Sequence, residues 1–218
     1  MALVGNSHLV AGDSSAVTGV LARLREEGID IEKNPDLYVR SYTHFGVDDA
    51  RELRERADLS AQGQRRVFVL STPVMTAEAQ NALLKTFEEP PGNALFILVV
   101  PAPETLLPTL RSRMQRLDTG TAVYDRGLEG SAFLTASPTV RLDMIKPLLE
   151  KGDDERRDIS SIVMFLSTLE RALEKTPRRA SREGLAAIYR ARAFMADKGS
   201  LLKPLLEQVA LLVPRVKP

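Results

Sequence analysis

Two uninterrupted apolar runs constrain the fold of this chain more than any other feature of its sequence. Residues 67–70 (VFVL) and 95–100 (LFILVV) are each of strand length and contain no polar side chain. Such runs are typical of parallel strands that are covered on both faces. Between them, Ala79, Leu83 and Phe87 recur with helical spacing. The order strand, helix, strand predicts an α/β fold, an open parallel sheet with helices on both faces.

The flanking sequence extends the same alternation. Residues 8–12 predict a short buried strand that runs into a turn, and residues 17–24 have helical spacing. Residues 36–42 predict a partly exposed strand, and residue 47 opens another helix with an acidic first turn. Thr76 is placed to cap the helix that ends at Pro90. A further short helix is expected to begin at residues 103–107, before Pro108.

The pattern changes after residue 117. Residues 118–134 are expected to form a linker, because 118–130 are polar, rich in glycine and without a period. Residues 135–218 predict four amphipathic helices in a bundle. Residues 174–182 are expected to form a basic loop between two of them, with Arg178, Arg179 and Arg182. Counting Lys and Arg against Asp and Glu gives 14 and 18 up to residue 139, and 16 and 11 beyond it, a balance of −4 and +5.

Composition excludes several kinds of site. The chain has no cysteine, so disulfides and thiolate zinc sites are ruled out. His8 and His44 are its two histidines, too few for a histidine-rich metal site, and neither is expected to act as a ligand or base. We expect no metal and no cofactor. No apolar run approaches the roughly 20 residues that cross a bilayer, so a cytoplasmic protein without membrane contact is expected.

The turn after the first strand lacks the residues that bind a nucleotide. A phosphate-binding loop places glycines, a lysine and a Ser or Thr in the order GxxxxGK[ST]. Here the corresponding residues 12–19 read GDSSAVTG, with no lysine, and Asp13 would repel a phosphate. The turn at residues 71–74 (STPV) has no acidic residue to organise magnesium. Both halves of a hydrolytic site are therefore missing, although the fold can persist without the reaction.

Four segments carry a family resemblance. Residues 75–91 (MTAEAQNALLKTFEEPP) resemble the signature helix of bacterial clamp-loader subunits, the delta-prime and gamma/tau components of DNA polymerase III, which are AAA+ proteins. The likeness continues through 96–99 (FILV) and 106–114 (LLPTLRSRM). Upstream, residues 46–53 (GVDDAREL) are similar to the helix that precedes the second nucleotide-binding strand in this family. The resemblance covers residues 46–117, about a third of the chain.

The resemblance implies a role for Ser112 and Arg113. In this family the motif Ser-Arg-Cys carries an arginine finger, which reaches the γ-phosphate of ATP on the neighbouring subunit, and here Met114 replaces the cysteine. A chain without its own ATP site that still presents this arginine resembles delta-prime, a subunit that is not an enzyme on its own. The implied partners are gamma/tau-like ATPases and a delta-like subunit, with the sliding clamp and primed DNA as indirect partners. The family's zinc-binding cysteines and small helical lid have no counterpart, and residues 135–218 would correspond to its oligomerisation collar.

Other interpretations of the same residues stay open. Arg113 could be a surface arginine, and the helix at 77–88 is expected to be structural, with Glu88 and Glu89 solvated. Arg178, Arg179 and Arg182 could contact a DNA backbone or belong to a solvated loop without a binding role. Two alternative functions are an autonomous ATPase with an unorthodox site and a stand-alone DNA-binding or scaffold protein on an AAA+ frame.

Overall fold

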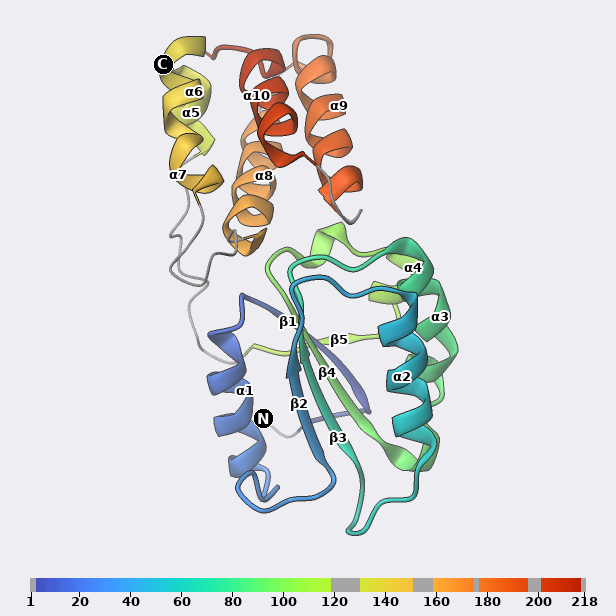
Figure 1. The fold of residues 1–218 in the computed structure, drawn as a ribbon. Coiled ribbons are helices and arrows are strands. Elements are labelled where there is room, and N and C mark those ends of the chain that lie inside the picture. Colours follow the sequence, from blue (N-terminus) through green and yellow to red (C-terminus); the bar gives the residue numbers. More distant parts are fainter. Residues whose placement is uncertain (1–2, 119–129, 151–158, 175–176, 196–200, 217–218) are drawn as a thin grey trace. The chain divides into compact units, whose positions relative to one another are not determined.

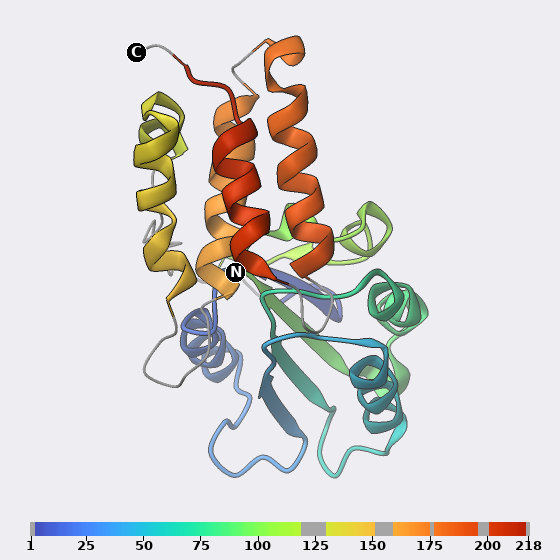
Figure 2. The same ribbon diagram turned by 45° about the horizontal axis from the view of Figure 1, so that its top comes forward.

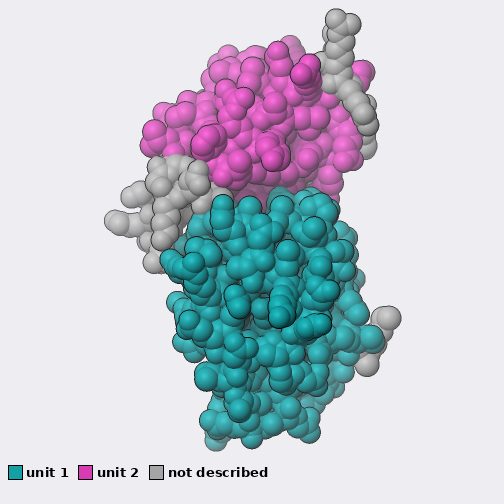
Figure 3. Space-filling view, turned by 90° about the vertical axis from the view of Figure 1, so that its right-hand side faces the viewer, with its two compact units in different colours: residues 1–124 teal, residues 125–218 magenta. Residues whose placement is uncertain are grey.

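The computed structural model describes residues 3–118, 130–150, 159–174, 177–195 and 201–216 of the 218-residue chain. The chain divides into two compact units, Met1–Tyr124 and Asp125–Pro218, which Figure 3 distinguishes by colour. None of the described helices is long and apolar enough to cross a membrane.

The first unit is built on a parallel sheet (Figure 1). Its described strands are, in chain order, β1 (Ser7–Ala11), β2 (Leu37–Ser41), β3 (Val67–Ser71), β4 (Leu95–Val100) and β5 (Gln115–Arg116). They are arranged in the order β2-β3-β4-β1-β5, and every pair is parallel. The two apolar runs form β3 and β4, which lie side by side inside the sheet, whereas the two-residue strand β5 has no signal in the sequence.

Helices cover both faces of the sheet, as the sequence predicted (Figure 1). Residues of β3 alternate between the faces: Val67 and Val69 pack toward α1 (Ala16–Glu26), and Phe68 and Leu70 toward α2 (Val47–Asp58) and α3 (Ala77–Glu88). Each face therefore has its own apolar core, worth roughly 25 cal/mol for each Å² removed from water. The predicted α/β fold class is confirmed.

Local signals explain where α3 and its neighbours begin and end. The hydroxyl of Thr76 accepts a hydrogen bond from the backbone N–H of Ala79 at 3.1 Å, which makes it the predicted N-cap of α3. After α3 the chain forms the 3-10 turn η1 (Pro91–Asn93), and after β4 the turn η2 (Pro103–Thr105). The expected helix at 103–107 is this 3-10 turn, and α4 (Pro108–Arg111) begins only at Pro108, a residue suited to the first helical position.

The described part of the second unit is helical (Figure 2). Phe133 and Phe165 meet edge to face at its centre, with ring centroids 4.9 Å apart. Gly184 allows a close approach to the chain end, because a β-carbon there would lie 2.9 Å from Cα of Val213. The helices are α5 (Gly130–Thr135), α6 (Pro138–Met144), α7 (Lys146–Leu149), α8 (Ile159–Leu173), α9 (Arg178–Met195) and α10 (Leu202–Leu212).

The structure differs from the expected linker at 118–134. Residues 119–129 lie outside the described residues, but 130–134 belong to α5. Phe133 and Leu134 are buried, and a β-carbon at Gly130 would lie 2.8 Å from the backbone oxygen of Thr168. Gly130 is thus a close-packing residue between α5 and α8 rather than a flexible joint.

The expected basic loop at 174–182 is wrong for its second half, since α9 begins at Arg178. The carbonyl of Pro177 accepts the backbone N–H groups of Ala180 and Ser181 at 2.9 and 3.2 Å, which closes the first helical turn. Pro177 therefore marks the start of a helix. Residues 175–176 lie outside the described residues.

Candidate functional site

The turn after β1 is closed by its own side chains. Oδ1 of Asp13 accepts the backbone N–H of Ser15 at 2.9 Å and its hydroxyl at 2.5 Å. The next N–H groups, of Ala16, Val17 and Thr18, donate to carbonyls within the same turn. A phosphate at a helix N-terminus needs these N–H groups and benefits from a nearby cation. At the start of α1 the carboxylate of Asp13 instead accepts the N–H of Ser15, so this donor is not available to a phosphate.

Gly12 is required where the chain passes from β1 into this turn. Its N–H donates to the carbonyl of Val100 on β4 at 2.9 Å, and a β-carbon at Gly12 would lie 2.6 Å from Cβ of Ala16. A contact so short is not tolerated, so glycine allows α1 to approach the sheet. Gly12 is explained by packing, and Ser14 has no hydrogen bond of its side chain among the described residues.

The turn after β3 is equally devoid of hydrolytic chemistry. Thr72 is buried, its hydroxyl donates to the carbonyl of Val74 at 2.8 Å, and its N–H donates to the carbonyl of Val99. His8 is also buried, with Nε2 3.3 Å from the carbonyl oxygen of Gly5, and burial lowers its pKa. In the described ranges no three His, Asp or Glu side chains gather as a metal site would require.

Ser112 and Arg113 follow α4 on the surface of the first unit. The hydroxyl of Ser112 donates to the carbonyl of Thr109 at 3.1 Å. Nη1 of Arg113 donates to the same carbonyl at 2.8 Å, and its Nε donates to Oε2 of Glu88 at 2.8 Å. The side chain of Arg113 is 32% exposed. Glu88 is exposed, as predicted, and its carboxylate also forms an ion pair with Arg113, which the sequence did not indicate.

A buried glutamine attaches α4 to α3. Nε2 of Gln80 donates to the carbonyl of Met75 at 3.0 Å, and its Oε1 accepts the N–H of Leu107 at 2.7 Å. Gln80 is 4% exposed, so both hydrogen bonds are shielded from water and hard to replace. The segment that carries Ser112 and Arg113 is thus fixed to α3 near both of its ends, by Gln80 and by Glu88.

The other predicted cations lie on α9. Arg182 is exposed, whereas the side chains of Arg178 and Arg179 fall outside the described residues. Arg182 belongs to the second compact unit, whereas Ser112 and Arg113 belong to the first.

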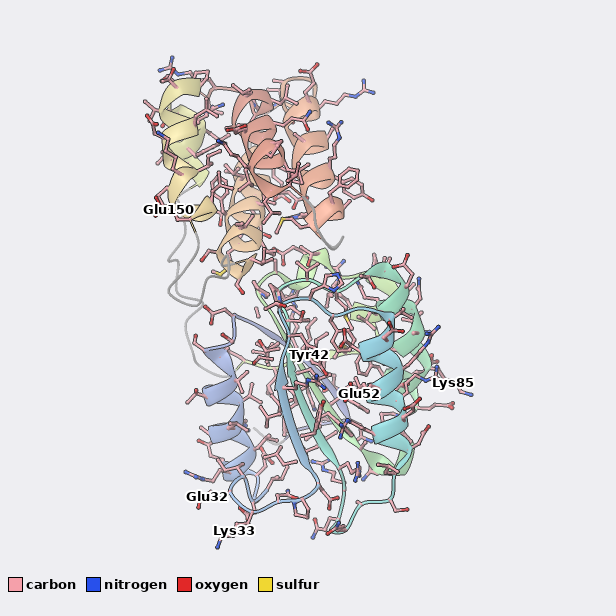
Figure 4. All side chains as sticks on the ribbon, in the orientation of Figure 1. Glu32, Lys33, Tyr42, Glu52, Lys85 and Glu150 are labelled. Carbon is pink, nitrogen blue, oxygen red and sulfur yellow. The ribbon has the colours of Figure 1, made fainter. Side chains whose placement is uncertain are left out.

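A second charged cluster lies where β2 meets α2 (Figure 4). Glu52 accepts from Arg40 at 3.0 Å and from Arg56 at 2.9 Å, and these arginines lower its pKa, with the hydrogen bond from Arg56 as the largest cause. Arg40 also lies over the ring of Tyr42, 5.0 Å from its centroid. Both guanidinium groups share one carboxylate, so Glu52 offsets one of the two positive charges.

Sequence reasoning missed Arg141, which is 1% exposed. Its five N–H groups all donate to main-chain carbonyls: Nε to Phe133, Nη1 to Ala210 and Val213, and Nη2 to Leu134 and Pro214. Burial lowers its pKa, and repulsion from Arg215 adds to this. The residue ties α5 and α6 to the end of α10. A lone arginine on an amphipathic helix gives no sign of this in the sequence.

Part of the first unit is similar to known proteins. Residues 25–121 match the family model described as DNA polymerase III, delta subunit. The chain is 49% identical over 73 residues to the DNA polymerase III subunit gamma/tau of Mycobacterium tuberculosis, which covers 33% of this chain and 13% of that protein. It is 42% identical over 86 residues to the DNA polymerase III subunit delta' of Escherichia coli, which covers 37% of this chain and 26% of that protein.

A solved structure also matches, that of a DNA polymerase III gamma subunit-related protein from Thermotoga maritima, with a TM-score of 0.44 and 21% identity over 93% of this chain and 65% of that one. The sequence matches span only an eighth to a quarter of the length of these two curated relatives. The predicted resemblance to the delta-prime and gamma/tau clamp-loader subunits of DNA polymerase III is thereby confirmed for residues 25–121.

Proposed function

We propose that this chain is a non-hydrolysing, delta-prime-like subunit of a clamp loader in DNA replication. It assembles with gamma/tau-like ATPase subunits and supplies Arg113 to a neighbour's ATP. The observation that carries the proposal is a contrast within one unit: Asp13 closes the turn where ATP would bind, while Arg113 remains partly exposed on the same frame. The similarity to subunits named delta' and gamma/tau supports the family role.

The closed turn favours a subunit without its own ATPase activity. An ATP phosphate at the start of α1 would meet the carboxylate of Asp13, and the turn contains no lysine to offset the repulsion. The turn after β3, residues 71–74, contains no acidic side chain to hold magnesium. In this proposal the second unit acts as the assembly collar, and sliding-clamp loading onto primed DNA is the activity of the whole complex in the cytoplasm.

Arg113 suits a role in trans. Guanidinium stays charged at physiological pH and offers a planar fork of donors to phosphate oxygens. Two of its donors are used within the chain, by Glu88 and by the carbonyl of Thr109. The Nη2 group has no partner among the described residues, so it remains for an anion on another subunit.

The test is the ATPase rate of the cognate motor subunits assembled with this chain and primed DNA. The Arg113→Ala variant should lower that rate by about 10³-fold, the lower end of the effect of an arginine finger. Arg111→Ala is the matched control, because this substitution removes the same charge two residues away, at the end of α4. Absence of assembly, or an unchanged rate with Arg113→Ala, would remove the proposal.

A stand-alone DNA-binding function is the second candidate, and the basic balance of the C-terminal residues favours it over an autonomous ATPase. Duplex DNA would then bind the isolated chain with an affinity that falls steeply with salt, because phosphate contacts release counterions. Under the leading proposal we expect the isolated chain to bind duplex DNA only weakly, and Arg182→Ala should change this affinity little.

A further inference from the structure

Glu88 and Arg113 form an ion pair between two elements of the first unit. Glu88 is the last residue of α3, and Arg113 lies two residues beyond α4. The Nε to Oε2 distance is 2.8 Å, and the carboxylate side chain is 55% exposed. The two residues are 25 positions apart, so the pair depends on α4 packing against α3.

The location of Glu88 is unfavourable without a cation. A helix C-terminus carries a partial negative charge, which disfavours a carboxylate there. Lys85 lies in the same last turn, on the outer side of α3 (Figure 4), yet it makes no ion pair with Glu88 among the described residues. Arg113 is the cation that offsets both the carboxylate and the end of the helix.

The way in which Arg113 is held leaves its outer end available. Of five guanidinium N–H groups, Nε donates to Glu88 and one from Nη1 donates to the carbonyl of Thr109. Two contacts restrict the torsions of a long side chain, while both Nη2 hydrogens stay unused within the described residues. A reaction is faster when the side chain that assists it is already held in position, because less conformational entropy is lost on reaching the transition state.

We propose that Glu88 is a positioning residue for Arg113. It holds the Nε edge of the guanidinium, so that the Nη2 end is presented to a phosphate on the neighbouring subunit. This role rests on the proposed trans function of Arg113. Glu88 touches no substrate and acts through the arginine alone.

The first test uses the full chain assembled with its cognate motor subunits. Glu88→Ala should lower kcat of the neighbour's ATPase about tenfold with little change in KM, since the misplaced arginine still exists. Glu88→Gln, which keeps an acceptor but not the charge, should lie between Glu88→Ala and wild type. The matched control is Glu89→Ala, an adjacent exposed carboxylate without an ion pair in the described structure, and it should keep the wild-type rate.

A double-mutant cycle separates positioning from a structural effect. If Glu88 acts through Arg113, Glu88→Ala should cause no further loss in an Arg113→Ala background. An additional loss there, or a full wild-type rate for Glu88→Ala beside a defective Arg113→Ala, would overturn the positioning role and leave the proposed function intact. A wild-type ATPase rate with Arg113→Ala would overturn both the positioning role and the proposed function.

The second test needs no partner. In the isolated chain labelled with ¹⁵N-arginine, the Nε–H of Arg113 should exchange slowly with solvent, because it donates to Glu88. The slow exchange should vanish in Glu88→Ala and persist in Glu89→Ala. Fast exchange in the wild-type chain would show that the tether does not exist, and it would refute the inference whatever the activity of the complex.

Discussion

Arg113 in the first unit and Arg141 in the second are both held by main-chain carbonyls, but they use their donors differently. Arg141 is buried and spends all five N–H groups on carbonyl oxygens of its own unit. Arg113 is partly exposed and spends two, one of them on the carboxylate of Glu88. An arginine whose N–H groups all donate within the chain stabilises the fold, whereas unused N–H donors at the surface can bind a partner.

The aspartates and glutamates of the first unit show the same division. Asp36 is buried and accepts the N–H groups of Gln62 and Gly63 at 2.9 and 2.6 Å. Asp13 closes the start of α1 in the same manner at the surface. Of these three carboxylates, Glu88 is the one that accepts a hydrogen bond from a guanidinium group. The comparison therefore separates charges that fix local structure from the pair proposed to act on a neighbour.

The largest effect on stability should come from Arg141. Arg141→Met keeps an unbranched apolar stem but leaves buried carbonyls of α5 and α10 without donors, so it should lower the free energy of unfolding by about 3 kcal/mol. Urea titration followed by circular dichroism would measure this. Arg215→Ala removes one exposed hydrogen bond, to Thr135, and should cost less than about 1 kcal/mol. Equal losses of unfolding free energy in the two variants would contradict the structural role given to the buried hydrogen bonds of Arg141.

A smaller effect should appear only in acid, through Asp36. Hydrogen bonds from Gln62 and Gly63, followed by the nearby charge of Arg66, lower the pKa of Asp36 below its ordinary value. A lowered pKa means that the folded state binds the proton less readily than the unfolded state. The stabilisation is therefore complete above the ordinary pKa of about 4 and is lost as the pH falls through the folded-state value.

Unfolding free energies measured between neutral pH and acid would check this. The wild-type chain should lose stability below about pH 4, and Asp36→Asn should lose less over the same range. Asp58→Asn, at an exposed position, is the charge-matched control. If the unfolding free energy of Asp36→Asn fell with pH as steeply as that of the wild-type chain, the hydrogen-bonded carboxylate of Asp36 would not be the source of the acid sensitivity.

The sequence predicted the sheet because its signals are local. Continuous apolar runs marked β3 and β4, Thr76 capped α3, and the missing lysine after β1 was visible directly. These features depend on neighbouring residues, so no knowledge of tertiary structure is needed to interpret them.

The errors arose where distant residues meet. Glu88 is exposed as predicted, but its ion pair with Arg113 is not visible until α4 is placed beside α3. Arg141 is indistinguishable from a surface cation until carbonyls up to 73 positions away surround it. Gly130 is typical of a flexible linker until its contact with Thr168 is known. Tertiary packing decided each case, and it overrides local propensity.

The central claim is that the first unit has lost its own nucleotide site, and titration of the isolated chain with magnesium and ATP tests it most directly. We expect no saturable binding and no turnover up to millimolar ATP, because Asp13 occupies the start of α1 and the turn contains no lysine. Micromolar binding with magnesium-dependent hydrolysis by the isolated chain would contradict it.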